Sequence, residues 1–205
     1  MTARFITLEG IEGVGKSTNL EFVRGLINEA GHQVQVTREP GGTAMAERLR
    51  DIVLHHDEES VPALAELLIM FAGRCLHLEN LIRPVLESGT WVLCDRFTDA
   101  TYAYQGGGRG QRLERIETLE AWVQDGLQPD LTLLLDADPE VGLARAGARG
   151  EKDRFEREQV EFFARVRSAY LERASRYPDR MVVIDAGRSL EEVQSSITIH
   201  MQKLL

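Results

Sequence analysis

FITLEGIEGVGKST, at residues 5–18, joins a short apolar run to a glycine-rich turn. From Gly10 to Ser17 the spacing satisfies G-x-x-x-x-G-K-[ST] in full. Glycines let the backbone curl so that several N–H groups point into one anion-sized hollow, and a helix beginning near Lys16 directs its positive end at the same hollow. The pattern predicts a nucleoside triphosphate site, with Lys16 at the β/γ-phosphates and the Ser17 hydroxyl ligating Mg²⁺.

A glycine-rich strand-to-helix turn without a ligand is the alternative interpretation of this stretch. The adjacent lysine and serine, between the correct flanking patterns, favour the phosphate-binding interpretation. The residues predicted to bind ATP are Gly10, Ile11, Glu12, Gly13, Val14, Gly15, Lys16, Ser17 and Thr18.

The composition is that of an ordinary folded protein with an acidic surface. The chain has 205 residues, 43% of them hydrophobic, and a formal net charge of −9. These values support a buried core and argue against a broad nucleic-acid-binding face. Two cysteines are too few for a disulfide framework, and no zinc-binding spacing occurs. Because no leader precedes the first apolar run and no run approaches a membrane span, we expect a cytoplasmic protein without membrane contact.

Short apolar runs alternate with helical patterns along the chain. Strands are predicted near residues 4–9, 33–37, 90–95, 131–136 and 181–185, and helices at 16–30, 62–86, 97–105 and 155–175. This alternation favours a parallel sheet covered on both faces, with ligands beyond the carboxyl ends of its strands. We therefore predict an α/β protein of the P-loop NTPase fold. It would be a single domain over residues 1–205, with a five-stranded parallel sheet and a short arginine-rich lid at about 145–155.

Turn and capping residues mark several element ends. Gly31 fits the C′ position of the first helix, Asp138 and Pro139 are typical of a helix N-terminus, and Ser189 opens the last helix. Residues 106–110, Gly-Gly-Gly-Arg-Gly, are too rich in glycine for regular structure, so we expect a mobile loop there.

Two arginines stand where a ligand could meet them. Arg38 follows a predicted strand and precedes a tight Pro-Gly-Gly loop, which would aim it at the active-site edge unless it is a surface arginine in a turn. Arg74 lies on the helix predicted at 62–86, three residues after Phe71, so both can face one cavity. A ligand contact and an ordinary salt bridge are equal alternatives for Arg74. The wide apolar surface of this helix predicts a core helix or a dimer face.

The strand at 90–95 ends in Asp95 and Arg96. An apolar strand that ends in aspartate resembles a Walker B element, whose carboxylate holds Mg²⁺, and the next arginine brings a guanidinium to the phosphates. Asp136, at the end of the fourth predicted strand, is the rival, and the adjacent arginine favours Asp95. Thr101 and Gln105, four residues apart on the following helix, share a face suited to reading the edge of a base.

Residues 144–154 are small, glycine-broken and rich in arginine. A solvated charge run is one interpretation, and a lid that brings arginine to a transferring phosphoryl group is the other. The cationic groups exceed what one triphosphate needs, so we expect a second phosphate-bearing substrate. Because neither an Asn-Lys-x-Asp guanine motif nor an Asp-x-x-Gly switch occurs, a GTPase is disfavoured.

Together these motifs resemble the thymidylate kinase family, the nucleoside monophosphate kinases that form dTDP and ADP from dTMP and ATP. The similarity spans nearly the whole chain, in the segments 8–18, 38–43, 71–74, 95–97 and 103–110 and in the arginine-rich lid. It implies Mg²⁺ as cofactor, ATP and dTMP as partners, and a homodimer through long helices. The alternatives are another pyrimidine nucleoside or nucleotide kinase, such as one acting on thymidine, and an ATP-gated binding module without turnover.

The resemblance implies catalytic roles for several charged residues. Lys16 and Arg96 would neutralise the phosphates. Gly13 stands where some members carry a loop arginine, so Arg149 or Arg154 of the lid would substitute for it, as in the bacterial-type subgroup.

The resemblance also implies ligands for the metal and the acceptor. Glu9 and Asp95 would organise Mg²⁺ and nearby water, with Ser17 as a direct ligand. One departure from the family is mild, because a threonine at 101 replaces the serine of many members and keeps the hydroxyl. The implied dTMP contacts are Glu12 at the sugar 3′-hydroxyl, Arg38 and Arg96 at the phosphate, Phe71 stacked on thymine, Arg74 at its O4, and Thr101 and Gln105 at its N3.

Overall fold

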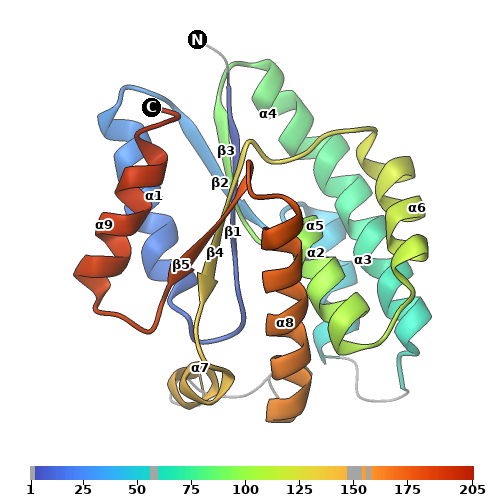
Figure 1. The fold of residues 1–205 in the computed structure, drawn as a ribbon. Coiled ribbons are helices and arrows are strands. Elements are labelled where there is room, and N and C mark those ends of the chain that lie inside the picture. The colour runs from blue at the N-terminus through green and yellow to red at the C-terminus, as the bar shows by residue number, and fades with distance from the viewer. Residues whose placement is uncertain (1–2, 56–59, 147–153, 156–157) are drawn as a thin grey trace.

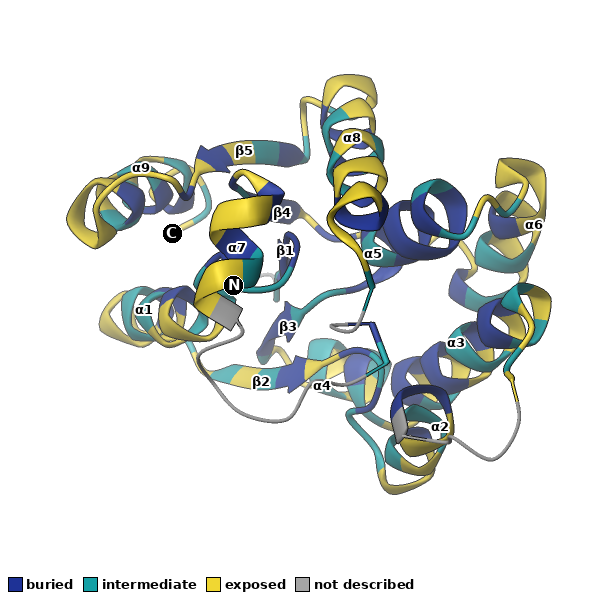
Figure 2. Cartoon of the chain, turned by 90° about the horizontal axis from the view of Figure 1, so that it is seen from below, coloured by how far each residue is buried: buried dark blue, intermediate teal, exposed yellow. Residues whose placement is uncertain are grey.

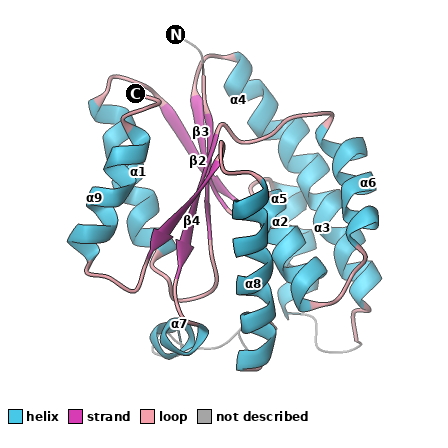
Figure 3. Ribbon diagram, in the orientation of Figure 1, coloured by secondary structure: helices cyan, strands magenta, loops and turns pink. Residues whose placement is uncertain are grey.

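The protein is built on a five-stranded, all-parallel sheet with the strand order β2-β3-β1-β4-β5. The computed structural model describes residues 3–55, 60–146, 154–155 and 158–205. The strands are β1 (Phe5–Glu9), β2 (Val34–Arg38), β3 (Trp91–Asp95), β4 (Leu131–Asp136) and β5 (Met181–Asp185). Each begins and ends within one residue of its predicted position, and the α/β P-loop fold class is confirmed. In Figure 3 the arrows of β4 and β5 point toward α7, which marks the carboxyl edge of the sheet.

Helices cover both faces of this sheet. Figure 1 shows α1 and α9 on one side and α3, α4, α6 and α8 on the other. Their bounds are α1 (Lys16–Glu29), α2 (Ala44–His55), α3 (Ala63–His77), α4 (Arg83–Glu87), α5 (Thr98–Thr101), α6 (Leu113–Gln124), α7 (Pro139–Ala146), α8 (Val160–Arg176) and α9 (Leu190–Met201), with π-helical segments η1 (Leu78–Ile82) and η2 (Tyr102–Gly108).

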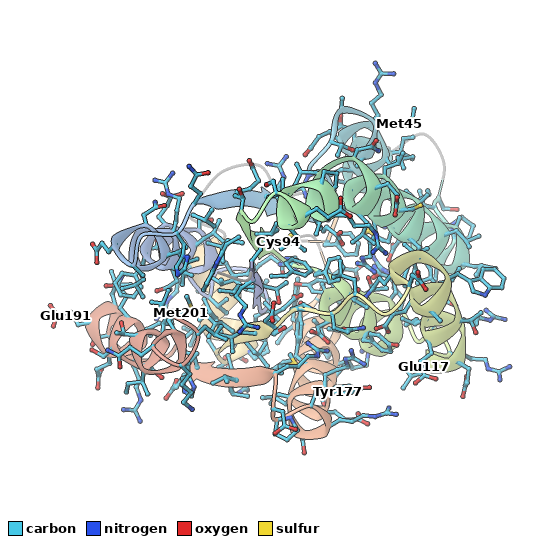
Figure 4. The ribbon with its side chains drawn as sticks, turned by 90° about the horizontal axis from the view of Figure 1, so that it is seen from above. Met45, Cys94, Glu117, Tyr177, Glu191 and Met201 are labelled. Atoms are coloured by element: carbon cyan, nitrogen blue, oxygen red, sulfur yellow. The ribbon has the colours of Figure 1, made fainter. Side chains whose placement is uncertain are left out.

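The core lies on both faces of the sheet because the three central strands, β3, β1 and β4, are buried along almost their whole length. All five residues of β1 are buried. One apolar cluster brings Phe5, Val92 and Cys94 of the sheet against Leu78 and Ile82 of η1. Figure 4 accordingly shows Cys94 near the centre of the molecule, and Figure 2 shows buried residues turned inward on the surrounding helices.

The predicted caps are confirmed. The Glu140 N–H donates to Asp138 Oδ1 over 2.9 Å at the start of α7. Ser189 and Glu192 form a reciprocal capping box at the start of α9, which satisfies two otherwise unpaired donors. Gly31 follows the end of α1 with φ +86°, and its N–H donates to a carbonyl of the last turn.

Two expectations about local structure are wrong. The predicted loop at 106–110 begins as helix, because η2 continues α5 through Gly108. The close approach of α8 explains this: a Cβ on Gly107 would lie 2.6 Å from the Cβ of Ala169 and 2.9 Å from the carbonyl oxygen of Arg165. The close packing of the two helices thus requires glycine here, and the packing overrides its low helix propensity. The helix predicted from residue 155 begins at Val160 instead, since Phe155 lies in a turn with its side chain toward η2.

The predicted helix at 62–86 is confirmed as the continuous run of α3, η1 and α4. Most of the predicted lid, residues 147–153, lies outside the described residues, and so does Arg149. No described helix is long and apolar enough to cross a bilayer.

Candidate active site

The loop between β1 and α1 curls around the start of the helix. Gly15 takes the left-handed conformation, with φ +88°, and α1 begins at the next residue. The ammonium of Lys16 donates to the carbonyl oxygens of Gly10 at 3.1 Å and Ile11 at 2.8 Å, so it lies over the loop. Burial and the nearby charge of Arg96 lower the pKa of Lys16 to about 8. An anion bound in the loop would relieve this electrostatic penalty.

Gly13 seals the loop against α7. Its φ is +75°, and a Cβ there would lie only 1.8 Å from the carbonyl oxygen of Gly142. No side chain fits at this position, which agrees with the prediction that any further catalytic arginine must come from elsewhere in the chain.

A cavity of about 310 Å³ opens beside this loop, at the carboxyl edge of β2 and β3. It is lined by the phosphate loop, the ends of both strands, α2, α3 and the α5–η2 helix, together with Phe155. The lining residues are Glu12, Gly13, Gly15, Lys16, Ser17, Arg38, Glu39, Pro40, Arg50, Leu54, Met70, Arg74, Asp95, Arg96, Phe97, Ala100, Thr101, Tyr104, Gln105 and Phe155.

Most of the predicted site residues therefore meet at one place. The cavity brings together both ends of the predicted constellation, the phosphate loop and the base-reading pair Thr101 and Gln105. Of the predicted ATP-binding residues, Gly10, Ile11, Val14 and Thr18 belong to the loop or the first turn of α1 but do not line the cavity.

Asp95 is the better of the two rival metal carboxylates. In the sheet register it lies beside Leu8 on one neighbouring strand and Arg38 on the other. Its Oδ1 is buried and has no hydrogen-bond partner among the described residues, and Ser17 lines the same cavity. An oxygen pair of this kind, completed by phosphate oxygens and water, suits Mg²⁺. Asp136 instead receives two hydrogen bonds from Arg167, at 2.7 and 2.8 Å, and does not line the cavity.

Arg96, Glu12 and Tyr104 form a charged group in the lining of the cavity. Arg96 has φ +68° and donates to Glu12 Oε1 over 2.7 Å. Its guanidinium lies 4.7 Å from the ring centre of Tyr104, whose hydroxyl also donates to Glu12. Burial acts to raise the pKa of Glu12, but the charges of Arg96 and Lys16 outweigh it and lower that pKa. A carboxylate held ionised in this way can accept a hydrogen bond from a ligand hydroxyl.

Arg74 lines the same cavity and is held by two hydrogen bonds. Its Nε donates to Glu39 Oε2 and its Nη2 to Thr101 Oγ1, both over 2.8 Å. Its Nη1 is buried and has no hydrogen-bond partner within the described ranges. The salt bridge to Glu39 is therefore present, and because Arg74 also lines the cavity, a ligand contact stays a prediction.

The structure does not bring Phe71, predicted to stack on the base, to the cavity. Its side chain is buried in a cluster with Leu67, Tyr102 and Ile116 and does not line the cavity. Met70, the residue before it, lines the cavity instead. Residues three and four positions before Arg74 both lie near it on a helix, so packing of α3 against η2 and α6 decides which one faces the ligand.

Glu9 lies behind the cavity and does not line it. Its carboxylate accepts from the Phe97 N–H and the Tyr170 hydroxyl, each over 2.7 Å, and the residue is fully buried. Burial and the nearby charge of Asp99 raise its pKa to about 8. Any influence of Glu9 on a metal would pass through the strand end that it supports, since its oxygens are engaged by protein donors.

Arg154 does not line the cavity either. Its guanidinium is bonded to the carboxylate of Glu66, and its Nε donates to the carbonyl oxygen of Val53 over 2.8 Å. Arg109 also faces Glu66, at 3.4 Å. Arg154 is therefore paired with a residue of α3, whereas the neighbouring Phe155 lines the cavity.

Sequence reasoning missed three residues that shape the site: Met70, Tyr104 and Glu39. The role of Met70 could have been predicted, because it precedes Arg74 by four residues on a predicted helix and so lies on the same face. Tyr104 precedes Gln105, yet its hydroxyl contact with Glu12 joins residues 92 apart in sequence. A local sequence pattern cannot predict a contact between residues so far apart in the chain.

The strand order, the curled loop after β1 and the cavity at the carboxyl edge define the class: this is a P-loop NTPase with an arginine-lined cavity beside its phosphate loop. The chain belongs to the thymidylate kinase family, because the family model described as thymidylate kinase matches residues 8–197. The resemblance seen in the motifs is thereby confirmed.

Individual relatives agree with the family. The chain is 58% identical to a thymidylate kinase of Hahella chejuensis, over 94% of this chain and 93% of the relative. It is also 58% identical to a thymidylate kinase of Pseudomonas putida, over 96% of this chain and 94% of that protein. A crystal structure of thymidylate kinase from Ehrlichia chaffeensis superposes with a TM-score of 0.80 at 31% identity, covering 98% of this chain and all of that one.

Proposed function

We propose that this protein transfers the γ-phosphoryl group of ATP to dTMP, giving dTDP and ADP for DNA synthesis. The observation that carries the proposal is the cavity itself. Its lining brings the phosphate loop together with Arg96, Arg74 and Gln105. Two thymidylate kinase relatives, each 58% identical to this chain, support the same reaction.

The chemistry requires positioning and charge neutralisation rather than a covalent intermediate. ATP and the acceptor phosphate repel each other, and Lys16 and Arg96 offset this repulsion from the two sides of the transferring group. Mg²⁺, held by Ser17 and by Asp95 directly or through water, would add positive charge at the phosphates. The acceptor phosphate is already ionised at neutral pH, so the reaction needs no strong general base.

The acceptor would lie along the cavity from Arg38 to Gln105. Its phosphate would contact Arg38 and Arg96. Arg38 would then give up its 2.8 Å hydrogen bond to Glu47 and bind the phosphate instead. Its 3′-hydroxyl would donate to Glu12. Thymine O4 would accept from Arg74, and Thr101 and Gln105 would meet N3. Met70 would pack against the face of the ring, in place of Phe71.

Two further features of the family complete the proposal. Arg149 or Arg154 would reach the phosphoryl group from the 145–155 segment when both substrates are bound, and Arg154 would then leave Glu66. We also propose a homodimer, in the cytoplasm, with small nucleotides rather than nucleic acid or membrane as partners. Leu64 and Leu68 support the dimer, because both are about half exposed on α3.

A coupled assay with Mg²⁺ and ATP tests the function against dTMP, dUMP, dCMP and thymidine as acceptors. We expect dTMP to be the preferred acceptor, with dTDP as product. Lys16→Ala should lower turnover at least ~100-fold without loss of fold, and Lys203→Ala, on the exposed C-terminal turn, should leave it unchanged. A preference for thymidine would indicate a nucleoside kinase. ATP binding without product from any acceptor would indicate a binding module.

A further inference from the structure

Glu66 is a fully buried carboxylate that the proposed mechanism does not use. It lies on α3, two turns before Arg74, with no exposed surface. Its Oε1 accepts from Gln105 Nε2 over 2.9 Å. Its Oε2 faces two guanidinium groups, those of Arg154 and Arg109. One carboxylate thus joins the base-reading amide to two arginines that lie outside the cavity lining.

This contact fixes which way the Gln105 amide points. An ionised carboxylate only accepts hydrogen bonds, so the NH₂ group of Gln105 must face Glu66 and its oxygen must face away. A protonated carboxyl could donate to the amide oxygen and permit the opposite orientation. In the structure Gln105 Nε2 donates to Glu66 Oε1, so the amide takes the first of these orientations.

The fixed amide gives the end of the cavity a definite polarity. Gln105 lines the cavity with its amide oxygen turned away from Glu66, and Arg74, which has only donor groups, belongs to the same lining. A pyrimidine dione offers the complement, an N3–H donor beside an O4 acceptor. Cytosine offers the reverse at both positions, an N3 acceptor beside an amino donor, so it meets acceptor with acceptor and donor with donor.

We propose that Glu66 is a positioning residue for nucleobase selection: by fixing the Gln105 amide, it admits a pyrimidine dione and excludes cytosine. The inference deepens the function proposed above and rests on it. A carboxylate that merely neutralised Arg109 and Arg154 would stabilise the fold equally for every acceptor. The distinguishing property is therefore the ratio between two acceptors, not the activity with one.

Glu66→Gln is the direct test. An amide at 66 can present either its oxygen or its NH₂ group, so Gln105 becomes free to turn. We expect the dCMP to dTMP ratio of kcat/KM to rise about tenfold or more, with the loss appearing in the KM for dTMP and not in kcat. The same ratio measured as equilibrium dissociation constants, by calorimetry without turnover, should shift in parallel.

Glu158→Gln is the matched control. It removes another carboxylate that pairs with Arg109 but has no contact with Gln105, so the acceptor ratio should not change. Glu66→Asp covers the case in which Glu66→Gln does not fold. It keeps the negative charge beside the arginines, yet it is one methylene shorter and withdraws from the amide, so the ratio should again rise.

An unchanged dCMP to dTMP binding ratio in the folded variant overturns the inference, whatever happens to stability. Failure of the proposed function looks different. If the parent protein binds dTMP more tightly than dCMP but forms no dTDP, the reaction is wrong, and the binding ratio of the Glu66 variants still decides this inference.

Discussion

Met70 and Phe71 are neighbours on α3 with different surroundings. Met70 lines the cavity, whereas Phe71 is 2% exposed and packs beneath it. We expect Met70→Ala to raise the KM for dTMP about 5–10-fold with a small loss of stability, because it removes a thioether from the face of the bound base. Steady-state kinetics with dTMP as the varied substrate measures this effect.

Phe71→Leu is the paired test. It should lower the free energy of unfolding by about 1 kcal/mol and leave the KM for dTMP close to that of the parent, because Phe71 contacts core residues. Urea denaturation gives the first quantity and the coupled assay the second. The opposite pattern, with the KM raised only by Phe71→Leu, would return the stacking role to Phe71.

Glu9 should give stability a recognisable pH dependence. Burial, followed by the charge of Asp99, raises its pKa from 4.5 to about 8 in the folded protein. The native state therefore keeps a proton that the unfolded chain loses near pH 4.5. The stability associated with this proton is complete below about pH 4.5 and is lost as the pH rises through about 8.

Glu9→Gln removes the titration and keeps an oxygen that can accept from the Phe97 N–H. We therefore compare the free energy of unfolding of the variant with that of the parent. The difference between them should shift in favour of the variant by on the order of 2 kcal/mol from about pH 6 to pH 9. Urea denaturation at both pH values measures the difference. Glu117→Gln, on the exposed face of α6, is the control. A difference that does not vary with pH would mean that Glu9 is ionised throughout.

At the scale of elements, the contact between η2 and α8 depends on glycine. Because a Cβ at Gly107 would meet the backbone of Arg165 and the side chain of Ala169, we expect Gly107→Ala to destabilise the fold by about 1–3 kcal/mol. Gly25→Ala, in the interior of α1 with no atom within 4 Å of the added Cβ, should instead stabilise by up to about 1 kcal/mol. Thermal melts of the two variants, compared with the parent, check both signs.

The elements differ in how far the sequence predicts them. Strands buried on both faces are continuous apolar runs, so their bounds follow closely from composition. Capped helix ends, such as those at Asp138 and Ser189, are equally predictable, because the capping side chain lies next to the helix end in the sequence. The helical state of Gly106–Gly108 is not predictable from the local sequence, since it depends on α8, which begins more than fifty residues later. The same limit explains why the choice between Met70 and Phe71 required tertiary contacts.

At the scale of the whole molecule, the position of the site was predictable from the sequence, whereas the pairing of its buried charged residues was not. Parallel strands bring their carboxyl ends to one edge, so Arg38, Asp95 and the phosphate loop had to converge. The partners of buried charges follow no such rule. Glu66 with Arg154 and Glu12 with Tyr104 are pairs 88 and 92 residues apart, and packing alone selects them.

The proposed dimer makes a prediction about the outer surface of α3 and α6. Leu64 and Leu68 of α3 and Trp122 of α6 are 45%, 49% and 78% exposed, and Figure 1 shows both helices on the side of the molecule away from α1 and α9. In a two-fold interface each residue meets the same surface of its partner, so Leu68→Glu would place two carboxylates in an apolar contact. We expect the parent to sediment as a dimer at micromolar concentration and Leu68→Glu as a folded monomer.

Ile199→Glu, 60% exposed on α9, adds the same charge on the opposite side of the sheet and should stay dimeric. A parent protein that sediments as a monomer at every concentration would refute the dimer. A dimer that Leu68→Glu leaves intact but Ile199→Glu disrupts would move the interface to α9. Because α3 also carries Glu66, Met70 and Arg74, a dimer through its outer face would hold the base-binding end of the cavity against a second rigid helix. Dimer dissociation by Leu68→Glu should then raise the KM for dTMP more than the KM for ATP.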